Sequence, residues 1–205
     1  MKILYLGDSI TDCAKNAASG STLPIGQSYV MLTAARLGAD NLGKYEFVNQ
    51  GISGNRIVDV YARIKRDCWN HQPDLISILI GVNDVWHEIN HQNGVEADRF
   101  EKMYDALLSD TRAKLPNVKF MLLEPFVLPG GATNAHWEEF RSETAIRGEI
   151  VERLAKKYGA VYIPLQERLD KAAGEHPEWI TPDGVHPSPA GHQIIADAWL
   201  AAFPG

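Results

Sequence analysis

The stretch KILYLGDS (residues 2–9) places a serine directly after a short apolar run. Residues 2–6 have the pattern of a strand buried on both faces, and Gly7 lets the backbone turn where that strand ends. In open parallel sheets, ligands bind at the carboxyl ends of the strands, which is where Ser9 would lie. A serine at this place is either the N-cap of the next helix or a nucleophile, and these residues alone favour the cap. The decision therefore depends on the rest of the chain.

Strand-like and helix-like patterns alternate along the chain. The expected strands cover residues 2–6, 45–51, 74–81, 118–126 and 160–164. The expected helices cover residues 28–38, 56–68, 96–115 and 137–157, with a last one that carries Ile194, Ile195, Ala198, Trp199 and Phe203. This alternation predicts an α/β fold, a three-layer α/β/α sandwich around a parallel sheet of about five strands. With no repeat, linker or low-complexity tract in 205 residues, we expect a single domain over residues 1–205.

Charge and composition exclude several classes of partner. The chain has 26 acidic and 20 basic residues, and no basic run is longer than Lys156-Lys157, which argues against nucleic-acid and anionic-membrane binding. Cys13 and Cys68 are the only cysteines and form no C-x-x-C motif, as in a reduced cytoplasmic protein. We find no signal peptide and no segment long enough to span a membrane. We therefore expect a cytoplasmic protein with a small-molecule partner, and the sequence leaves homo-oligomerisation open.

Chemistry-bearing residues follow the expected strands. The first strand ends in Gly7-Asp8-Ser9, the second in NQGISGN (49–55) and the third in GVND (81–84). A late loop, TPDGVHPSPAGH (181–192), leads into the last helix. A serine nucleophile needs a base within hydrogen-bond reach and a third group that orients the base. A carboxylate three residues before a histidine can accept its Nδ1–H. We therefore predict Ser9 as nucleophile, His186 as base and then acid, and Asp183 as the orienting carboxylate.

The negative charge that develops on an attacked carbonyl needs preorganised hydrogen-bond donors. The candidates are the side-chain amide of Asn83, the backbone N–H of Gly54 and the N–H of Ser9 itself. A glycine suits position 54 because its backbone can approach a substrate closely. Asp8 is expected to hold the first loop by hydrogen bonds, and Asp84 need be only a turn residue.

These four blocks resemble the SGNH (GDSL-like) serine hydrolase superfamily, in the order that the family shows. Ile10 stands where the family usually has leucine. The resemblance covers nearly the whole chain and implies the flavodoxin-like fold of that superfamily, with no cofactor and no metal. The sequences of these blocks most resemble those of xylan and xylo-oligosaccharide acetylesterases. The blocks that carry the resemblance are Gly7-Asp8-Ser9, Gly54 in NQGISGN, Gly81-x-Asn83-Asp84 and Asp183-x-x-His186.

The resemblance does not specify which ester is the substrate. Related blocks occur in thioesterases, lysophospholipases and other carbohydrate deacetylases, so a short- to long-chain lipolytic esterase stays an alternative. The loops around the blocks are rich in Asn, His, Trp and Glu, which favours a small acyl group on a polar alcohol. We predict removal of O-acetyl groups from sugars, xylo-oligosaccharides in particular, through an acetylated Ser9. A non-catalytic sugar-binding protein would be expected to have lost one of the site residues.

One rival motif is HEINH (His87–His91), which matches the H-E-x-x-H signature of zinc peptidases. Ala97 stands where the longer signature needs its third ligand. The motif also follows the turn at residues 81–84 and leads into Asn93-Gly94, so it is expected to be a polar loop at the mouth of the site and not a helix. His192 is a rival for the base, but it lies in the last helix with no acid three residues before it.

Trp86, Trp137 and Trp179 lie in or beside expected loops. Trp86, three residues after Asn83, is the best candidate for a platform on which a sugar stacks, and we predict Trp86 and Trp137 as substrate-binding residues. The long connection from Phe126 to Phe140 begins Gly/Pro-rich and is expected to form a lid or a binding wall.

Overall fold

The computed structural model describes residues 1–15 and 25–205. Its strands form one parallel sheet in the order β2-β1-β3-β4-β5, the order of a flavodoxin-like sheet. The predicted five-stranded parallel α/β fold is therefore confirmed. The strands are β1 (Lys2–Gly7), β2 (Glu46–Gly51), β3 (Leu75–Leu79), β4 (Lys119–Leu123) and β5 (Val161–Ile163).

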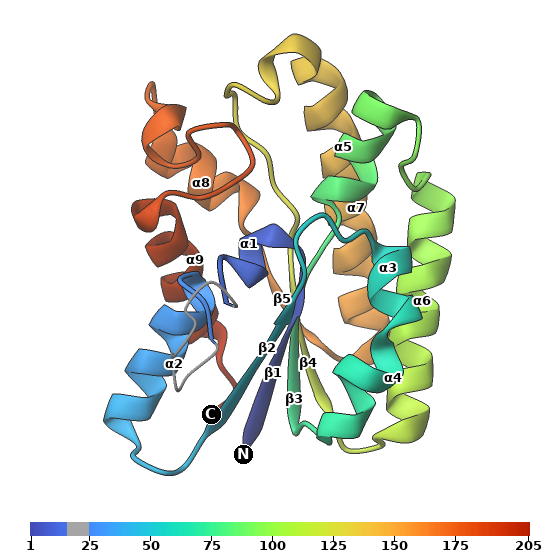
Figure 1. The fold of residues 1–205 in the computed structure, drawn as a ribbon, viewed down its shortest axis with the longest axis vertical. Helices are drawn as coiled ribbons and strands as arrows, with labels where there is room; N and C mark the ends of the chain where they lie inside the picture. Colours follow the sequence, from blue (N-terminus) through green and yellow to red (C-terminus); the bar gives the residue numbers. More distant parts are fainter. Residues whose placement is uncertain (16–24) are drawn as a thin grey trace.

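Helices cover both faces of this sheet, as Figure 1 shows. One layer holds α2 (Tyr29–Asp40), α8 (Gln166–Ala173) and α9 (Pro189–Ala202), and the other holds α3 (Ile57–Ala62), α4 (Ile64–Asp67), α6 (Ala97–Lys114) and α7 (Trp137–Tyr158). The remaining helices, α1 (Ser9–Asp12) and α5 (Val82–His91), follow the carboxyl ends of β1 and β3, and single 3₁₀ turns lie at Trp69–His71, Asn134–His136 and Pro177–Trp179. Within the described ranges, no helix is long and apolar enough to cross a bilayer.

The segment of the zinc-like motif differs from the expectation. The predicted polar loop at His87–His91 is wrong, because these residues form the second half of α5. Gly81, with a φ of 137°, turns the chain directly from β3 into this helix, so GVND is the first turn of the helix and not a loop. The Asn93-Gly94 turn follows the helix, which ends at Gln92 in a left-handed conformation.

Two other helical segments differ from the sequence-based expectation. The helix expected over residues 56–68 is divided into α3 and α4 at Arg63, whose guanidinium donates to the Gln50 carbonyl on the edge strand β2 and to Asn55 Oδ1. Helix α8 was not predicted. Its sequence, QERLDKAA, buries only Leu169 and Ala173, so it has little of the apolar periodicity that identifies a helix.

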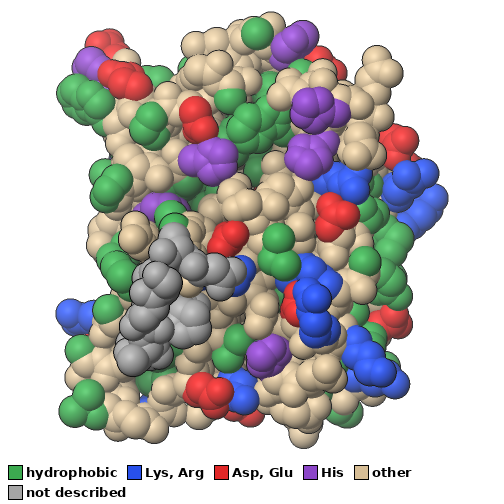
Figure 2. Space-filling model, in the orientation of Figure 1, with side chains coloured by type: hydrophobic (Ala, Val, Ile, Leu, Met, Phe, Trp, Pro, Cys, Tyr) green, Lys and Arg blue, Asp and Glu red, His purple; other side chains and the backbone are tan. Residues whose placement is uncertain are grey.

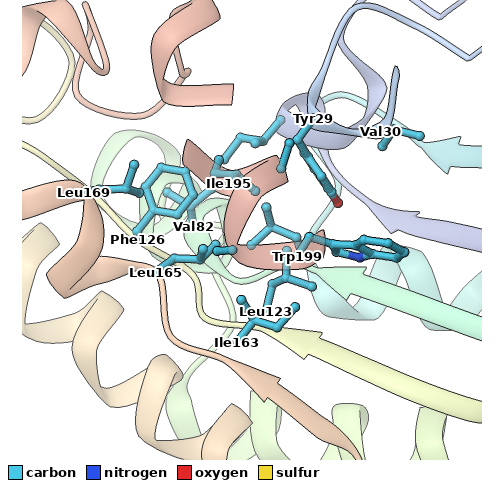
Figure 3. Packing of buried hydrophobic residues seen from close by; sticks show 14 of the residues in the cluster. Tyr29, Val30, Val82, Leu123, Phe126, Ile163, Leu165, Leu169, Ile195 and Trp199 are labelled. Atoms are coloured by element: carbon cyan, nitrogen blue, oxygen red, sulfur yellow. The ribbon is translucent and has the colours of Figure 1, made fainter. Parts of the chain in front are cut away.

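The sheet separates two apolar clusters, because successive residues of β1 point to opposite faces. Ile3 and Tyr5 belong to the cluster under α2, α8 and α9, and Leu4 and Leu6 to the cluster on the other side. Figure 3 shows part of the first cluster, where Trp199 of α9 packs among aliphatic and aromatic side chains. The Trp199 indole is fully buried and donates to the Ser77 hydroxyl at 2.9 Å, which attaches the last helix to the middle of the sheet.

We expect Trp199→Ala to lower the free energy of unfolding by about 3–5 kcal/mol, because it leaves a cavity and an unpaired Ser77 hydroxyl. Urea denaturation measures the change. Trp179→Ala is the matched control, since that side chain is 65% exposed, and should cost less than about 1 kcal/mol. Equal losses in the two variants would contradict the assignment of Trp199 to the core.

Candidate active site

The ends of the adjacent strands β2, β1 and β3 lie level with one another. In the strand register, Gly7 at the end of β1 is opposite Gly51 of β2 and Leu79 of β3. A Cβ on Gly7 would lie 2.3 Å from Thr11 Oγ1 and 2.5 Å from the Leu79 carbonyl oxygen, so only glycine lets α1 fold back onto the sheet here. The loops that follow β1, β2 and β3 therefore begin side by side.

Ser9 is the first residue of α1, and Asp8 before it is the N-cap. The Asp8 carboxylate accepts a hydrogen bond from the Ile10 amide at 2.9 Å. Asp8, and not Ser9, is therefore the N-cap, and this hydrogen bond holds the loop as predicted for Asp8. The Ser9 hydroxyl bonds elsewhere. Ser9 Oγ lies 2.9 Å from Nε2 of His186, which is 177 residues away in the chain.

The other edge of the His186 ring contacts Asp183, whose Oδ2 lies 2.6 Å from Nδ1. Asp183 Oδ1 accepts from the amides of Val185 and His186, so one carboxylate fixes both its own loop and the imidazole. Burial opposes ionisation of Asp183, but the hydrogen bonds from the His186 ring and from these amides outweigh it and lower the pKa of the carboxyl below its ordinary value. An ionised Asp183 requires a proton on Nδ1, which leaves Nε2 free to accept the Ser9 proton.

Residues 128–133, which we call the strap, hold the loop that carries Asp183. The Leu128 amide donates to the Gly184 carbonyl at 2.9 Å and the Ala132 amide to the Asp183 carbonyl at 2.8 Å. A Cβ on Gly130 would lie 2.2 Å from the Gly184 nitrogen, so the two backbones are in direct contact. Leu128 and Thr133 are buried. This part of the connection therefore supports the Asp183 loop, and the lid or binding wall expected of residues 126–140 stays a prediction.

The expected oxyanion donors lie on neighbouring segments. Gly54, with a φ of 79°, occupies the turn after β2, and Asn83 is almost fully buried in the first turn of α5. The Asn83 amide donates one hydrogen to the Asn55 carbonyl at 3.2 Å and carries a second one. Asp12 of α1 accepts from the amide and the hydroxyl of Ser53, which joins the Ser9 helix to the Gly54 turn.

Two buried carboxyl groups lie behind these segments. Asp84 is fully buried and accepts from the Ile57 amide at 3.0 Å, so it is more than the turn residue that was expected: it fixes the start of α3 relative to α5. Burial raises the pKa of Asp84 well above its ordinary value, and the Ile57 amide and the Arg147 charge offset this only in part. Burial likewise raises the pKa of Asp8 to about 7, against the Ile10 hydrogen bond and the charge of His186.

The predicted substrate-binding tryptophans occupy different positions. Trp86 is half-buried on α5, and its ring centroid lies 5.8 Å from that of His186. Trp137, the first residue of α7, is also half-buried and packs against the same apolar cluster as Trp86. Trp179 is exposed and stacks on His176 at 4.0 Å. Figure 2 shows several histidine side chains gathered with hydrophobic ones over the upper part of one face, where Figure 1 places the carboxyl ends of the strands.

His192, the rival for the role of base, has a structural position. It lies buried in α9, as expected, and its Nδ1 accepts a hydrogen bond from the Tyr29 amide at the start of α2. Burial, aided by the charge of His186, lowers the pKa of His192 to about 4. The ring is therefore neutral at pH 7 and joins α2 to α9.

The H-E-x-x-H segment lies on a helix, but its residues have other partners. His87 and His91 share one face of α5 with ring centroids 6.2 Å apart. Glu88 accepts from the Gly94 amide and thereby stabilises the turn that follows the helix. In residues 1–15 and 25–205, no group of three His, Cys, Asp or Glu side chains is arranged to hold a metal ion.

Comparisons with known proteins match nearly the whole chain. Residues 5–194 match the model of the GDSL-like Lipase/Acylhydrolase family. The chain is 32% identical over 208 residues to an acetylxylan esterase of Geobacillus stearothermophilus, an alignment that covers 97% of this chain and 92% of the relative. It is 26% identical to thioesterase 1/protease 1/lysophospholipase L1 of Escherichia coli, covering 97% and 81% of the two chains. The crystal structure of the Geobacillus stearothermophilus acetylxylan esterase Axe2 superposes with a TM-score of 0.86 at 32% identity, over 100% of this chain and 94% of that one.

The contact between Gly130 of the strap and Gly184 should keep the His186 imidazole in line with Ser9. Gly130→Ala should displace the backbone at residues 183–184 and so misalign the imidazole, which we expect to reduce kcat for an activated ester at least about tenfold. Gly131→Ala changes the next residue, where a Cβ would meet nothing within 4 Å, and should leave kcat unchanged. Steady-state kinetics on the two variants decides the matter, and equal rates would show that the strap does not control the site.

The buried Asp8 carboxyl should make the free energy of unfolding depend on pH. Its pKa is raised in the folded protein, so between about pH 4 and 7 the folded state binds more protons than the unfolded state, and the free energy of unfolding falls as the pH rises. Asp8→Asn removes this dependence while keeping an acceptor for the Ile10 amide. Relative to wild type, the free energy of unfolding of the variant should rise by about 3 kcal/mol between pH 4.5 and 8. Urea melts at both pH values measure this, and a constant difference would argue against a buried protonated carboxyl.

Proposed function

The chain belongs to the GDSL-like Lipase/Acylhydrolase family of carboxylic ester hydrolases, and we propose that it removes O-acetyl groups from sugars, xylo-oligosaccharides in particular. The observation that carries the proposal is the unbroken hydrogen-bonded series Ser9 Oγ, His186 Nε2, His186 Nδ1, Asp183 Oδ2, with distances of 2.9 and 2.6 Å. The similarity to an acetylxylan esterase over 97% of the chain supports the acetyl and sugar parts of the proposal.

In the first half of the reaction, Ser9 Oγ attacks the acetyl carbonyl carbon while His186 Nε2 takes the hydroxyl proton. The carbonyl oxygen becomes an oxyanion, which accepts hydrogen bonds from the N–H of Ser9, the N–H of Gly54 and the second amide hydrogen of Asn83. The ionised Asp183 stabilises the imidazolium and keeps its orientation. His186 then gives the proton to the leaving sugar oxygen, and the acetyl group stays on Ser9.

The second half repeats these steps with water. His186 Nε2 takes a proton from a water molecule whose oxygen attacks the acetyl carbonyl of acetylated Ser9. The same donors hold the oxyanion, and collapse of the intermediate breaks the bond to Ser9 Oγ, which recovers the proton from the imidazolium. Acetic acid leaves and loses its proton to the solvent, and the enzyme returns to its starting protonation state.

The surroundings of Trp86 support a sugar as the alcohol. A sugar presents hydroxyl groups at its edges, which suits polar side chains at the mouth of a site. Asn90, one helical turn after Trp86 on α5, is exposed, as is His91. Trp137, at the start of the helix that packs against α5, is the candidate contact for the less polar face of the sugar ring.

A second candidate function, a lipolytic esterase with longer acyl chains, is favoured by one observation. A groove of about 1100 Å³ follows the edge strand β2 and is lined by apolar side chains that include Met31 and Phe47. Charged side chains, among them Glu46 and Arg66, also line this groove, which extends to Asp12 and Ile52 beside the turn that carries Gly54. A long acyl chain could lie there, and the relative thioesterase 1/protease 1/lysophospholipase L1 gives this alternative further weight.

The deciding experiment compares p-nitrophenyl esters from acetyl to dodecanoyl with acetylated xylo-oligosaccharides, using wild type and Ser9→Ala. We expect acetyl esters to be preferred in both substrate series, and Ser9→Ala to lower kcat by a factor on the order of 10⁴ or more. Preference for long chains would keep the serine mechanism and favour the lipolytic function. Full activity of Ser9→Ala would contradict the mechanism itself.

A further inference from the structure

We infer that Trp86 is a positioning residue for His186: its indole packs against the imidazole and stabilises the imidazolium that forms when Ser9 loses its proton. The inference rests on the proposed function in one respect, because it requires His186 to be the general base. It assigns Trp86 a role in the chemical step, which differs from that of a platform for the sugar.

The contacts of His186 leave the faces of its ring for packing. The Nε2 edge meets Ser9 Oγ and the Nδ1 edge meets Asp183, so both nitrogens have partners in the ring plane. The Trp86 indole approaches with its ring plane inclined by 54° and its centroid 5.8 Å away. An indole attracts a cation that lies over its ring face within about 6 Å of the centroid, and the separation of the two centroids meets this distance condition.

Trp86 is itself held in place from behind. Phe140 of α7 is fully buried and meets the indole in an edge-to-face arrangement, with centroids 6.4 Å apart and planes at 70°. Trp86 also follows the buried first turn of α5, in which Asn83, Asp84 and Val85 are nearly inaccessible to solvent. The indole is therefore in range of both the Phe140 ring and the His186 ring, and the buried first turn of α5 limits its movement away from the imidazole.

The contact should act on the transition state more than on the bound substrate. The imidazole is neutral before the reaction and positively charged during proton transfer, so attraction between a cation and an indole appears only as the transition state forms. Such an interaction raises kcat and leaves KM unchanged, for any ester. A sugar platform would instead lower KM for sugar esters alone, so kinetics can separate the two roles.

The test compares Trp86→Leu and Trp86→Phe on p-nitrophenyl acetate, which contains no sugar, and on acetylated xylobiose. Leucine keeps an apolar side chain but has no π system, so we expect kcat to fall about 3- to 30-fold on both substrates with KM unchanged. Trp86→Phe should recover most of the rate. Trp179→Leu, which removes an indole that is 65% exposed, is the control and should leave both substrates unaffected.

A pH profile provides a second readout. Without the indole the imidazolium is less stable, so the acid limb of the profile of kcat/KM should move to lower pH by about 0.5–1 unit in Trp86→Leu. The other titratable groups that influence this ring are Asp183 in its own loop, Asp8 before α1 and His192 in α9. All of them are unchanged in the variants, so a difference between the profiles reports on Trp86.

Each alternative outcome overturns the inference. A rise in KM for acetylated xylobiose alone would make Trp86 a sugar platform, and unchanged kinetics in a folded Trp86→Leu would exclude any role. If Trp86→Leu fails to fold, by circular dichroism, Trp86→Phe decides: the acid limb of its kcat/KM profile must move to lower pH with KM for acetylated xylobiose unchanged, and an unmoved limb overturns the inference. Failure of the proposed function is seen separately: Ser9→Ala would keep its activity, or wild type would cleave p-nitrophenyl acetate and no sugar ester.

Discussion

The level ends of the adjacent strands β2, β1 and β3 are the constraint on which the site depends. Because Gly7 is opposite both Gly51 and Leu79, the segments after β1, β2 and β3 begin at one height and can share hydrogen bonds. Asp12 binds Ser53 across the segments after β1 and β2, whereas Asn83 binds the Asn55 carbonyl and Asp84 binds the Ile57 amide across the segments after β2 and β3. A slip of one residue in either strand pairing would reverse the side chains of that strand and separate these partners. The sheet register thus positions Ser9, Gly54 and Asn83 relative to one another.

The late loop reaches this edge by a different route. Asp183 and His186 lie between α8 and α9, and α9 is attached to the sheet through the buried indole of Trp199. The strap fixes the same loop through two backbone hydrogen bonds and the close approach of Gly130 to Gly184. A reactive imidazole needs this support, because a misplacement of about 1 Å can cost a hundredfold in rate. Rigid backbone contacts supply that support while Asp183 and His186 themselves stay partly exposed to substrate.

The buried acids show that the site is not built for stability alone. Asp8 and Asp84 are nearly inaccessible to solvent, and burial raises the pKa of both carboxyl groups. Burying a carboxyl group is costly unless it is protonated or well paired. Each one nevertheless accepts an amide hydrogen bond that fixes a segment next to a proposed catalytic residue, Ser9 in one case and Asn83 in the other. Residues in and around functional sites commonly reduce stability in this way.

The sequence by itself determined the α/β class, the parallel sheet and the residues expected to form the site. Apolar runs and helical periodicity can be recognised within a few neighbouring residues, so they indicate strands and helices without the rest of the fold. The blocks around Ser9, Gly54, Asn83 and His186 are short and distinctive. Only the tertiary structure decided that Asp8 takes the cap, that His87–His91 is helical, that residues 128–133 support Asp183, and that Trp86 meets His186. The helix at His87–His91 was obscured because turn residues on both sides resemble a loop. The support of Asp183 and the Trp86 contact join residues far apart in the chain, and such contacts arise from packing, which local sequence patterns do not record.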